Sequence, residues 1–254
     1  MDERRDNLGQ PIGFALPDWA ARALPPRSPM VGRHCRIEPI NFARHAAELH
    51  DAYQQDREGR NWTYLGYGPF DSLEAWSAWM ERTCRGSDPL FHAIIDEATG
   101  SAVGMASYLR LDPGAGVIEV GHIHYSPRLQ RHTAATEAMY LMMRRVFEEL
   151  GYRRYEWKCD ALNQPSRHAA RRLGFSFEGV FRQATIYKGR NRDTAWYAII
   201  DRDWPAIAEA YQRWLDPANF DARGRQRLHL ADLTRPTVAR TKLEALLQAR
   251  PAAP

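Results

Sequence analysis

Residues 117–150 decide the fold, because they form a strand, a loop and a helix in direct succession: VIEVGHIHY, SPRLQRHT and AATEAMYLMMRRVFEEL. The pattern predicts a strand over 117–125. Helical spacing over 134–150 predicts an amphipathic helix whose apolar stripe is Met139, Met142, Met143, Val146, Phe147 and Leu150. Gly151 follows at the place of a C-terminal cap. Ligands tend to bind where strands diverge beside a helix N-terminus, so this junction is the first candidate site.

Further strands surround this unit. Segments 91–95 and 102–111 precede it, and the short turns at 97–100 and 112–116 imply antiparallel neighbours. After the helix, Tyr155, Trp157 and Cys159 alternate with charged residues, which is typical of a half-buried strand. We therefore expect a mixed α/β (α+β) fold. Its sheet would be mostly antiparallel, with splayed parallel strands at its centre and helices on its faces.

The remaining elements follow from the same periodicities. Strands are predicted at 35–39, 177–187 and 194–201, the last two joined by a turn at 188–191. Helices are predicted at 42–55, from Asp71 or Ser72 onward, at 165–173, and along the stripe Ile207, Tyr211, Trp214 and Leu215. Glycines and a proline interrupt 61–70, which reads as an aromatic loop.

Composition limits the class of protein. The 254 residues are 44% hydrophobic and 26% charged, with a mean hydropathy of −0.57, which excludes a disordered chain. No apolar run approaches the ~20 residues of a membrane-spanning helix, and the first thirty residues lack the pattern of a secretory signal, so we expect a cytoplasmic protein. We divide the chain into a proline-rich extension (1–30), a main domain (31–204), and a C-terminal helix with a charged tail (205–254).

Charge and cysteine content leave partners open. The net charge is +4, and only three of the 35 basic residues are lysines, which permits a phosphate-bearing partner without identifying one. A nucleic-acid-binding protein is one alternative, supported by this basic balance alone. The three cysteines form no CxxC pair, so we expect reduced thiols and neither a disulfide framework nor a zinc site.

Two motifs carry a resemblance to a known family. The strand–loop–helix at 119–138 resembles the acyl-CoA motif of the GNAT N-acetyltransferases, whose loop runs Arg or Gln, two residues, Gly, any residue, then Gly or Ala. About forty residues later come Asn163-Gln164-Pro165-Ser166, Arg172-Leu173-Gly174-Phe175 and Glu178-Gly179. These resemble the second motif of the RimJ/RimL branch, the ribosomal-protein N-terminal acetyltransferases. The likeness extends over roughly residues 33–203 in element order.

The resemblance implies that acetyl-CoA is the co-substrate, and we expect no metal cofactor. The family's loop usually carries glycine where this chain has Arg131 and Thr133. The physical requirement is a run of free amides at the helix start, and no residue of 130–136 is proline, so the donors are present. The cofactor-binding residues that we expect are Ile123, Tyr125, Gln130, Arg131, His132, Thr133, Ala134, Ala135, Thr136 and Asn163.

The resemblance also implies direct attack of an amine on the thioester. Because an alkyl ammonium has a pKa near ~10, a base must remove a proton first. Glu119 stands where the RimJ/RimL branch often carries a glutamate and is our candidate base, directly or through a water; a solvent-facing strand glutamate is the alternative. Strand alternation places Glu119 on one face with Gly121, Ile123 and Tyr125. A backbone amide near Ile123 would stabilise the charge that develops on the carbonyl oxygen.

Ser166 matches the family position of a proton donor to the departing CoA thiolate, and Asn163 that of a group bonding the pantetheine arm. Both residues are equally explained as capping residues of a helix start. Trp62, Tyr64 and Tyr67, in the aromatic loop, correspond to the segment that covers the acceptor site in relatives; a hydrophobic lid over the core is the alternative.

Other interpretations stay beside this one. His122 and His124 share a strand face, but no third metal ligand lies nearby in sequence. Cys159 alternates with core aromatics, which favours a buried thiol over a nucleophile. The chain could also be a catalytically silent acyl-CoA-binding module or use another donor such as succinyl-CoA. Its acceptor is expected to be a protein N-terminus or a small amine, and a homodimer is compatible with the sequence.

Overall fold

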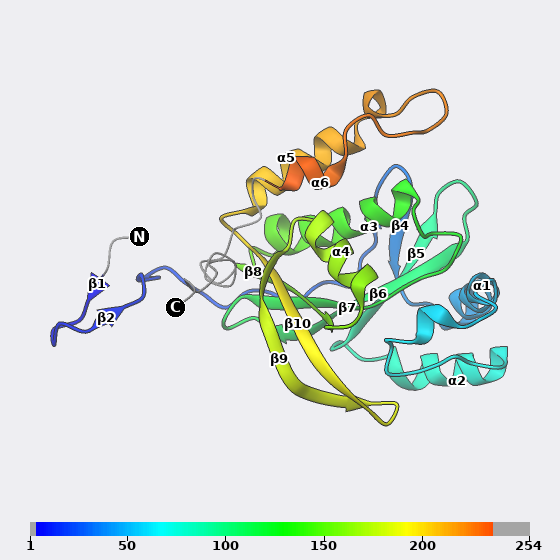
Figure 1. Ribbon diagram of the computed structural model, residues 1–254, viewed down its shortest axis with the longest axis horizontal. Helices are drawn as coiled ribbons and strands as arrows, with labels where there is room; N and C mark the ends of the chain where they lie inside the picture. Colours follow the sequence, from blue (N-terminus) through cyan, green and yellow to red (C-terminus); the bar gives the residue numbers. More distant parts are fainter. Residues whose placement is uncertain (1–3, 236–254) are drawn as a thin grey trace, which may run out of the picture.

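The computed structural model describes residues 4–235. Its main element is an eight-stranded sheet in the order β3-β4-β5-β6-β7-β8-β10-β9 (Figure 1). All neighbouring strands are antiparallel except the central pair β7–β8, which is parallel. The strands are β3 (Met30–Val31), β4 (Cys35–Pro39), β5 (Leu90–Asp96), β6 (Ala102–Asp112), β7 (Val117–Tyr125), β8 (Arg154–Asp160), β9 (Ser176–Tyr187) and β10 (Arg190–Ile200). The mixed sheet expected from the sequence is confirmed.

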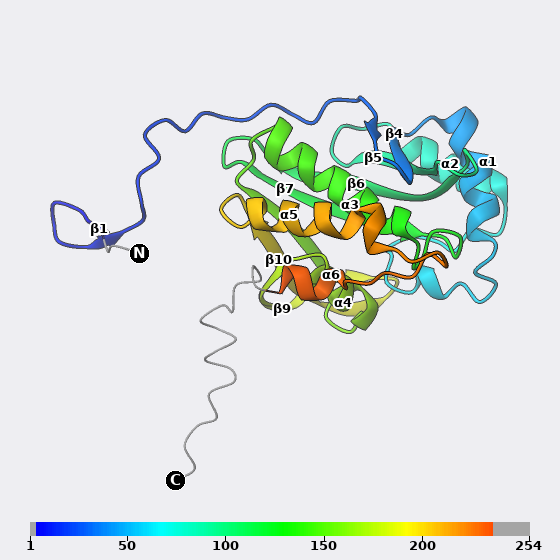
Figure 2. The same ribbon diagram turned by 90° about the horizontal axis from the view of Figure 1, so that it is seen from above.

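Helices cover both faces of the sheet and divide the core in two. On one face, α3 (Thr133–Arg144), α4 (Gln164–Arg172), α5 (Trp204–Leu215) and α6 (Leu230–Thr234) pack over the larger apolar cluster (Figure 2). On the other face, α1 (Phe42–Tyr53) and α2 (Leu73–Thr83) enclose a smaller, aromatic-rich cluster. Ser72 caps α2 by accepting from the amide of Ala75.

The parallel strands separate halfway along their length. Pairing of β7 with β8 runs from Val117–Arg154 to Val120–Trp157 and stops there, although both strands continue. Beyond this point the edge of β7 that faces β8 has no ladder partner among the described strands. Backbone groups on this edge are therefore open to a ligand.

A β-bulge in β7 corrects one sequence-based expectation. Gly121 pairs with Ser107 and His124 with Met105, so β7 contains one extra residue, and His122 adopts a left-handed φ of 49°. The bulge reverses the alternation: Ile123 and Tyr125 pack toward the α3 face, whereas His122 contacts Phe91 in the opposite cluster. The prediction that Glu119 shares a face with Ile123 and Tyr125 is therefore wrong.

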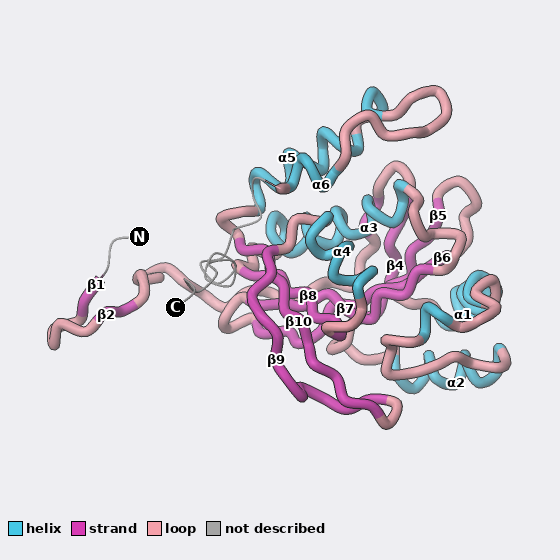
Figure 3. Tube along the Cα trace, viewed as in Figure 1, coloured by secondary structure: helices cyan, strands magenta, loops and turns pink. Residues whose placement is uncertain are grey.

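Two further differences concern local geometry. The helix expected at 134–150 begins at Thr133 and changes after Arg144 into a π-helical turn, Arg145–Glu149. The turn between β9 and β10 contains two residues, Lys188 and Gly189, both with positive φ, instead of the four expected. Such a tight turn matches the twist of its strands, and the hairpin, which contains two register shifts, extends as a ribbon beyond the sheet (Figure 3).

The N-terminal segment contacts the body through polar groups. Trp19 donates its indole N–H to the carbonyl of Gly114, and Tyr152 donates its hydroxyl to that of Ala23. Before this segment, the small hairpin of β1 (Arg4–Arg5) and β2 (Pro11–Ile12) projects away from the sheet (Figure 2). After α5 come the 3₁₀ turn η3 (Pro217–Asn219) and α6, and residues 236–254 of the predicted charged tail lie outside the described residues. Across 4–235 no helix has the length and apolar character needed to cross a membrane.

Candidate active site

A cavity of about 360 Å³ opens where β7 and β8 separate. Its walls are Glu119–Ile123 of β7, Trp157–Asp160 of β8 and the start of α4, and the aromatic loop lies against it. The structure brings the following predicted site residues together around it: Glu119, Ile123, Asn163, Ser166, Tyr64 and Tyr67. With Leu109 and Arg110 of β6 and Arg192 of β10, residues from six separate segments meet at one opening.

Glu119 is buried and held between two cations. Arg110 donates through Nη1 to both carboxylate oxygens at 2.7 Å, and Lys158 Nζ lies 2.9 Å from Oε2. Only 4% of the Glu119 side chain is exposed, whereas 62% of the Arg110 side chain is. The solvent-facing alternative for Glu119 is therefore wrong. Because Arg110 extends from the surface, it can leave one carboxylate oxygen without disturbing the core.

Lys158 extends this network away from the cavity. Its Nζ lies 2.7 Å from Glu156 Oε2 and 3.8 Å from the centre of the Trp196 ring. Burial opposes ionisation of Glu156, but hydrogen bonds from Lys158 and Arg154 outweigh it and lower its pKa. Sequence analysis missed Arg110 and Lys158, because each is an ordinary charged strand residue until the sheet brings it to Glu119.

Ser166 faces β8 from the first turn of α4. Its Oγ accepts a hydrogen bond from the indole N–H of Trp157 at 3.0 Å, while its amide donates to Asn163 Oδ1 at 3.1 Å. Asn163 is therefore the N-cap that the sequence predicted. The neighbouring Cys159 is buried, and burial raises the pKa of its thiol although Ser166 opposes this effect. A raised pKa agrees with the core-thiol interpretation.

The loop before α3 presents free amides. Within the described chain, the amides of Leu129, Gln130 and His132 bond inside the loop, whereas those of Arg131, Thr133 and Ala134 donate to no protein group. The N-cap, His132, provides no side-chain hydrogen bond to the helix start. Arg131 has a φ of 66°, a conformation that suits glycine. The loop therefore keeps the backbone shape of a glycine-containing loop despite its arginine.

The other predicted loop residues play structural parts. Tyr125 donates its hydroxyl to the carbonyl of Ala135, and Gln130 donates its side-chain N–H to the carbonyl of Tyr125 and to Asn61. Thr136 accepts from Arg172 through its hydroxyl. These bonds tie the loop to β7 and α4, so its free amides have a fixed direction.

The aromatic loop is divided between two sites. Tyr64 and Tyr67 line the cavity, and the Tyr67 hydroxyl is buried with no partner among the described residues. Trp62 does not line this cavity; it is 5% exposed and packs into the aromatic cluster beside Tyr53 and His124. Trp62 therefore fits the alternative of a hydrophobic lid better than direct contact in the cavity.

His122 is a cavity residue that sequence analysis considered only as a metal ligand. Burial and the nearby Arg110 lower its pKa to about 4, so its ring is neutral at pH 7. His124 does not join it at the cavity, because its ring stacks on Tyr53 with 3.8 Å between ring centres. Across residues 4–235, no group of three or more histidine, cysteine or acidic residues has the arrangement of a metal site.

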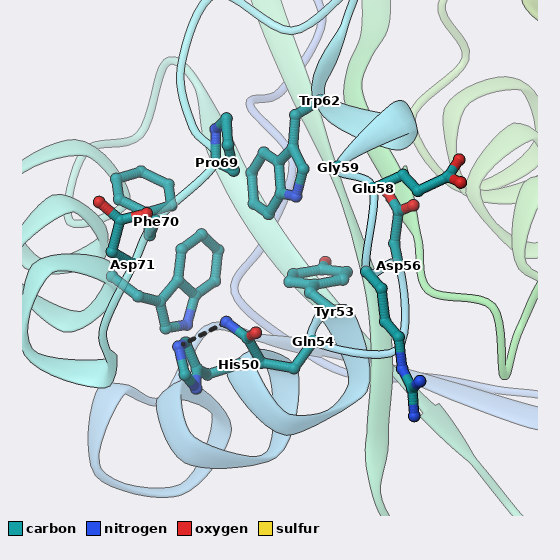
Figure 4. Close-up of a pocket in the computed structure, with 12 residues that line it drawn as sticks. His50, Tyr53, Gln54, Asp56, Glu58, Gly59, Trp62, Pro69, Phe70 and Asp71 are labelled. Carbon is teal, nitrogen blue, oxygen red and sulfur yellow. Dashed lines mark hydrogen bonds between the residues drawn. The ribbon is translucent and has the colours of Figure 1, made fainter.

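A second cavity, of about 340 Å³, lies between the end of α1 and the start of α2. Figure 4 shows Tyr53, Trp62 and Phe70 at its inner wall and the carboxylates of Asp56 and Asp71 on opposite sides. The rings of Tyr53 and Trp62 are 5.5 Å apart and nearly perpendicular, so they pack against each other. This cavity is separate from the opening between β7 and β8.

The separated parallel pair and the free amides at the start of α3 form an arrangement that suits a phosphate-bearing ligand. The sequence matches the family "Acetyltransferase (GNAT) domain" over residues 35–176, which is more than half of the chain. The chain belongs to this family, as its two motifs predicted, and it is therefore an acyltransferase that takes its acyl group from an acyl-CoA.

Similar proteins agree with this assignment. A GCN5-related N-acetyltransferase from Brucella melitensis is 44% identical, with a TM-score of 0.85 over 87% of this chain and 100% of that one. A probable GNAT-family acetyltransferase from Chromobacterium violaceum is 37% identical, with a TM-score of 0.72 over 78% of this chain and 98% of that one. The putative ribosomal N-acetyltransferase YdaF of Bacillus subtilis is 29% identical over 105 residues, 41% of this chain. That alignment spans only 57% of YdaF.

Proposed function

We propose that this protein transfers an acetyl group from acetyl-CoA to a primary amine by direct attack, the amine belonging to a small molecule or to a protein N-terminus. One observation carries the proposal: the cavity between the separated strands is lined by Glu119 on one side and Ser166 on the other. The similarity to YdaF, a putative ribosomal N-acetyltransferase, supports a protein N-terminus as one acceptor class.

We assign the phosphates of the co-substrate to the start of α3. The unbonded amides of Arg131, Thr133 and Ala134, together with the positive end of the helix dipole, suit a pyrophosphate. The remaining members of the proposed cofactor site are Ile123, Tyr125, Gln130, His132, Ala135, Thr136 and Asn163. Of these, Gln130, Tyr125 and Thr136 act by holding the loop in shape.

Glu119 is the proposed base. For it to accept a proton from the ammonium, directly or through a water, one carboxylate oxygen must be released by Arg110, whose exposed side chain allows this. Lys158 keeps the other oxygen in place. The amine then attacks the thioester carbonyl, and a β7 amide near Ile123 stabilises the oxyanion.

Ser166 is the proposed donor to the departing thiolate. Because Trp157 donates to its Oγ, the hydroxyl keeps its own proton for donation. A free thiol has a pKa near ~8.5, so protonating the thiolate assists its departure. Tyr64 and Tyr67 are the proposed contacts for the amine in the cavity, and Trp62 packs against Tyr67 from the core.

The test is to mix the protein with acetyl-CoA and a panel of amines and to measure thiol release and a gain of about 42 daltons, the mass of an acetyl group. Acetylation of at least one amine supports the proposal. Tight acetyl-CoA binding with no turnover on any amine would favour a silent binding module. Transfer from succinyl-CoA alone would change the donor, and strong salt-dependent binding of nucleic acid would favour the third alternative.

A further inference from the structure

The tip of the β9–β10 hairpin is hydrogen-bonded to the aromatic loop. Lys188 donates from Nζ to the carbonyl of Trp62, and Arg190 donates from Nη2 to the carbonyl of Thr63, each at 2.8 Å. The bonded residues are more than 120 positions apart in sequence. Both donors lie at the end of the ribbon that extends beyond the sheet (Figure 3).

The same loop reaches both walls of the cavity. Residues 60–67, here called the strap, are bonded on one side through Asn61 to Gln130 beside β7. On the other side, Tyr64 donates its hydroxyl to the carbonyl of Leu162, beside β8, at 3.2 Å. Five residues of the strap line the cavity between these points. The strap therefore crosses the opening between the two strands.

The tip of the hairpin is also bonded to the cavity wall, through the residue that precedes Lys188. Tyr187 donates its hydroxyl to Asp160 Oδ2 at 2.8 Å, and Asp160 is a cavity residue. Most of β9, by contrast, is exposed, including Phe181 and Ile186 at 56% and 78%. Little buried apolar surface holds the tip, so its position depends on polar contacts: the bond of Tyr187 to Asp160 and the two bonds to the strap.

We propose that Lys188 and Arg190 form a latch that keeps the strap closed over the acceptor half of the cavity, which makes them positioning residues for the amine. The inference rests on the proposed function. Because both donors bond to main-chain carbonyls, the latch depends on the position of the strap's backbone and not on the identity of its side chains. If the closed strap is the state that binds amine, then lowering its population to about a tenth raises the apparent acceptor KM about tenfold.

The experiment compares the double variant Lys188→Met, Arg190→Met with wild type. Methionine keeps the aliphatic length and removes the donors. Arg182→Met is the matched control, because Arg182 is exposed on the same hairpin and has no bond to the strap. Acceptor KM, acetyl-CoA Kd, melting temperature and hydrogen exchange of residues 60–67 are measured for each.

The double variant is expected to raise the acceptor KM about tenfold and to speed exchange in the strap, with acetyl-CoA Kd within about twofold of wild type. An unchanged acceptor KM together with unchanged hydrogen exchange in the strap would overturn the proposed latch. So would an equal loss of acceptor and acetyl-CoA binding with a lower melting temperature, since that indicates a general structural role. If wild type acetylates no amine, the proposed function fails, and exchange in the strap alone then decides the latch.

Discussion

Trp157 donates its indole N–H to Ser166 Oγ at 3.0 Å, which joins the end of the parallel strand pair to the first turn of α4. The bond fixes the rotamer of a hydroxyl that would otherwise be free at a helix start. It also occupies one of the two lone pairs of Oγ and leaves the hydroxyl proton available for donation.

Replacing Ser166 tests this role. Ser166→Ala is expected to lower kcat about 10²-fold with little change in acetyl-CoA Kd, because it removes a proton donor and leaves the Asn163 cap intact. Ser166→Thr should recover part of the activity, and Gln164→Ala, on the same helical turn, should match wild type. Wild-type kcat for Ser166→Ala would leave Ser166 a purely structural residue.

Glu119→Gln is expected to lower kcat by about 10²- to 10³-fold across the pH range, again with acetyl-CoA Kd nearly unchanged. Glutamine keeps the shape of the side chain but cannot accept the proton. The matched control is Glu178→Gln, which removes a charge from the same ion-pair network through Arg154 but lies outside the cavity. Full activity of the Glu119 variant at every pH would exclude Glu119 as the base.

Thr133→Pro is expected to weaken acetyl-CoA binding about five- to tenfold without lowering the melting temperature. Proline is well tolerated at the first helical position, and His132 already has the extended ψ of 155° that a residue before proline requires. The substitution thus removes one free amide and little else. Thr133→Ala keeps the amide and should bind like wild type in calorimetry; equal affinities for all three proteins would place the phosphates elsewhere.

Acid should destabilise the fold through buried histidines. Burial lowers the pKa of His92 and of His124 to about 3, and the ring of His124 has no hydrogen-bond partner among the described residues. The unfolded chain binds protons below a pKa near 6.5, whereas the folded chain does not. Stability is therefore fully present above pH 6.5 and falls as the pH drops toward 4, by up to ~1.4 kcal/mol per pH unit for each histidine.

Urea unfolding between pH 7.5 and 5 measures this effect. His92→Phe should reduce the slope of the free energy of unfolding against pH by the contribution of about one histidine. This expectation holds however much the substitution changes stability at pH 7.5. His168→Phe, at an exposed position of α4, should leave the slope unchanged. Identical slopes for all three proteins would show that His92 is not responsible.

Glu137 should contribute strongly to stability. Its carboxylate accepts the amides of Arg33, His34 and Cys35 at 2.9, 2.6 and 2.9 Å, and this approach requires Gly32, where a Cβ would lie 2.5 Å from the carboxylate. Glu137→Ala leaves three amides without an acceptor and is expected to cost about 3 kcal/mol in urea unfolding. Glu209→Ala, at an exposed position on α5, is the control. If both variants lost the same free energy of unfolding, Glu137 would have no special contribution to stability.

The sequence predicted the features that depend on neighbouring residues. Periodicity identified the strand of Cys35–Pro39 and the strand–loop–helix at the centre of the family motif, and the Asn163 cap followed from its position before a helix. The free amides of the loop followed as well, because the absence of proline is visible in the chain. Each of these depends on a few consecutive residues, which is why periodicity and local chemistry sufficed.

Only the tertiary structure decided what surrounds those elements. One extra residue in β7 reversed the faces beyond Gly121, Glu119 became part of an ion-pair network, and Trp62 turned into the core. The latch contacts join residues more than 120 positions apart. The physical reason is that strand register, burial and ion pairing depend on which distant segments pack together, and local periodicity carries no information about those partners.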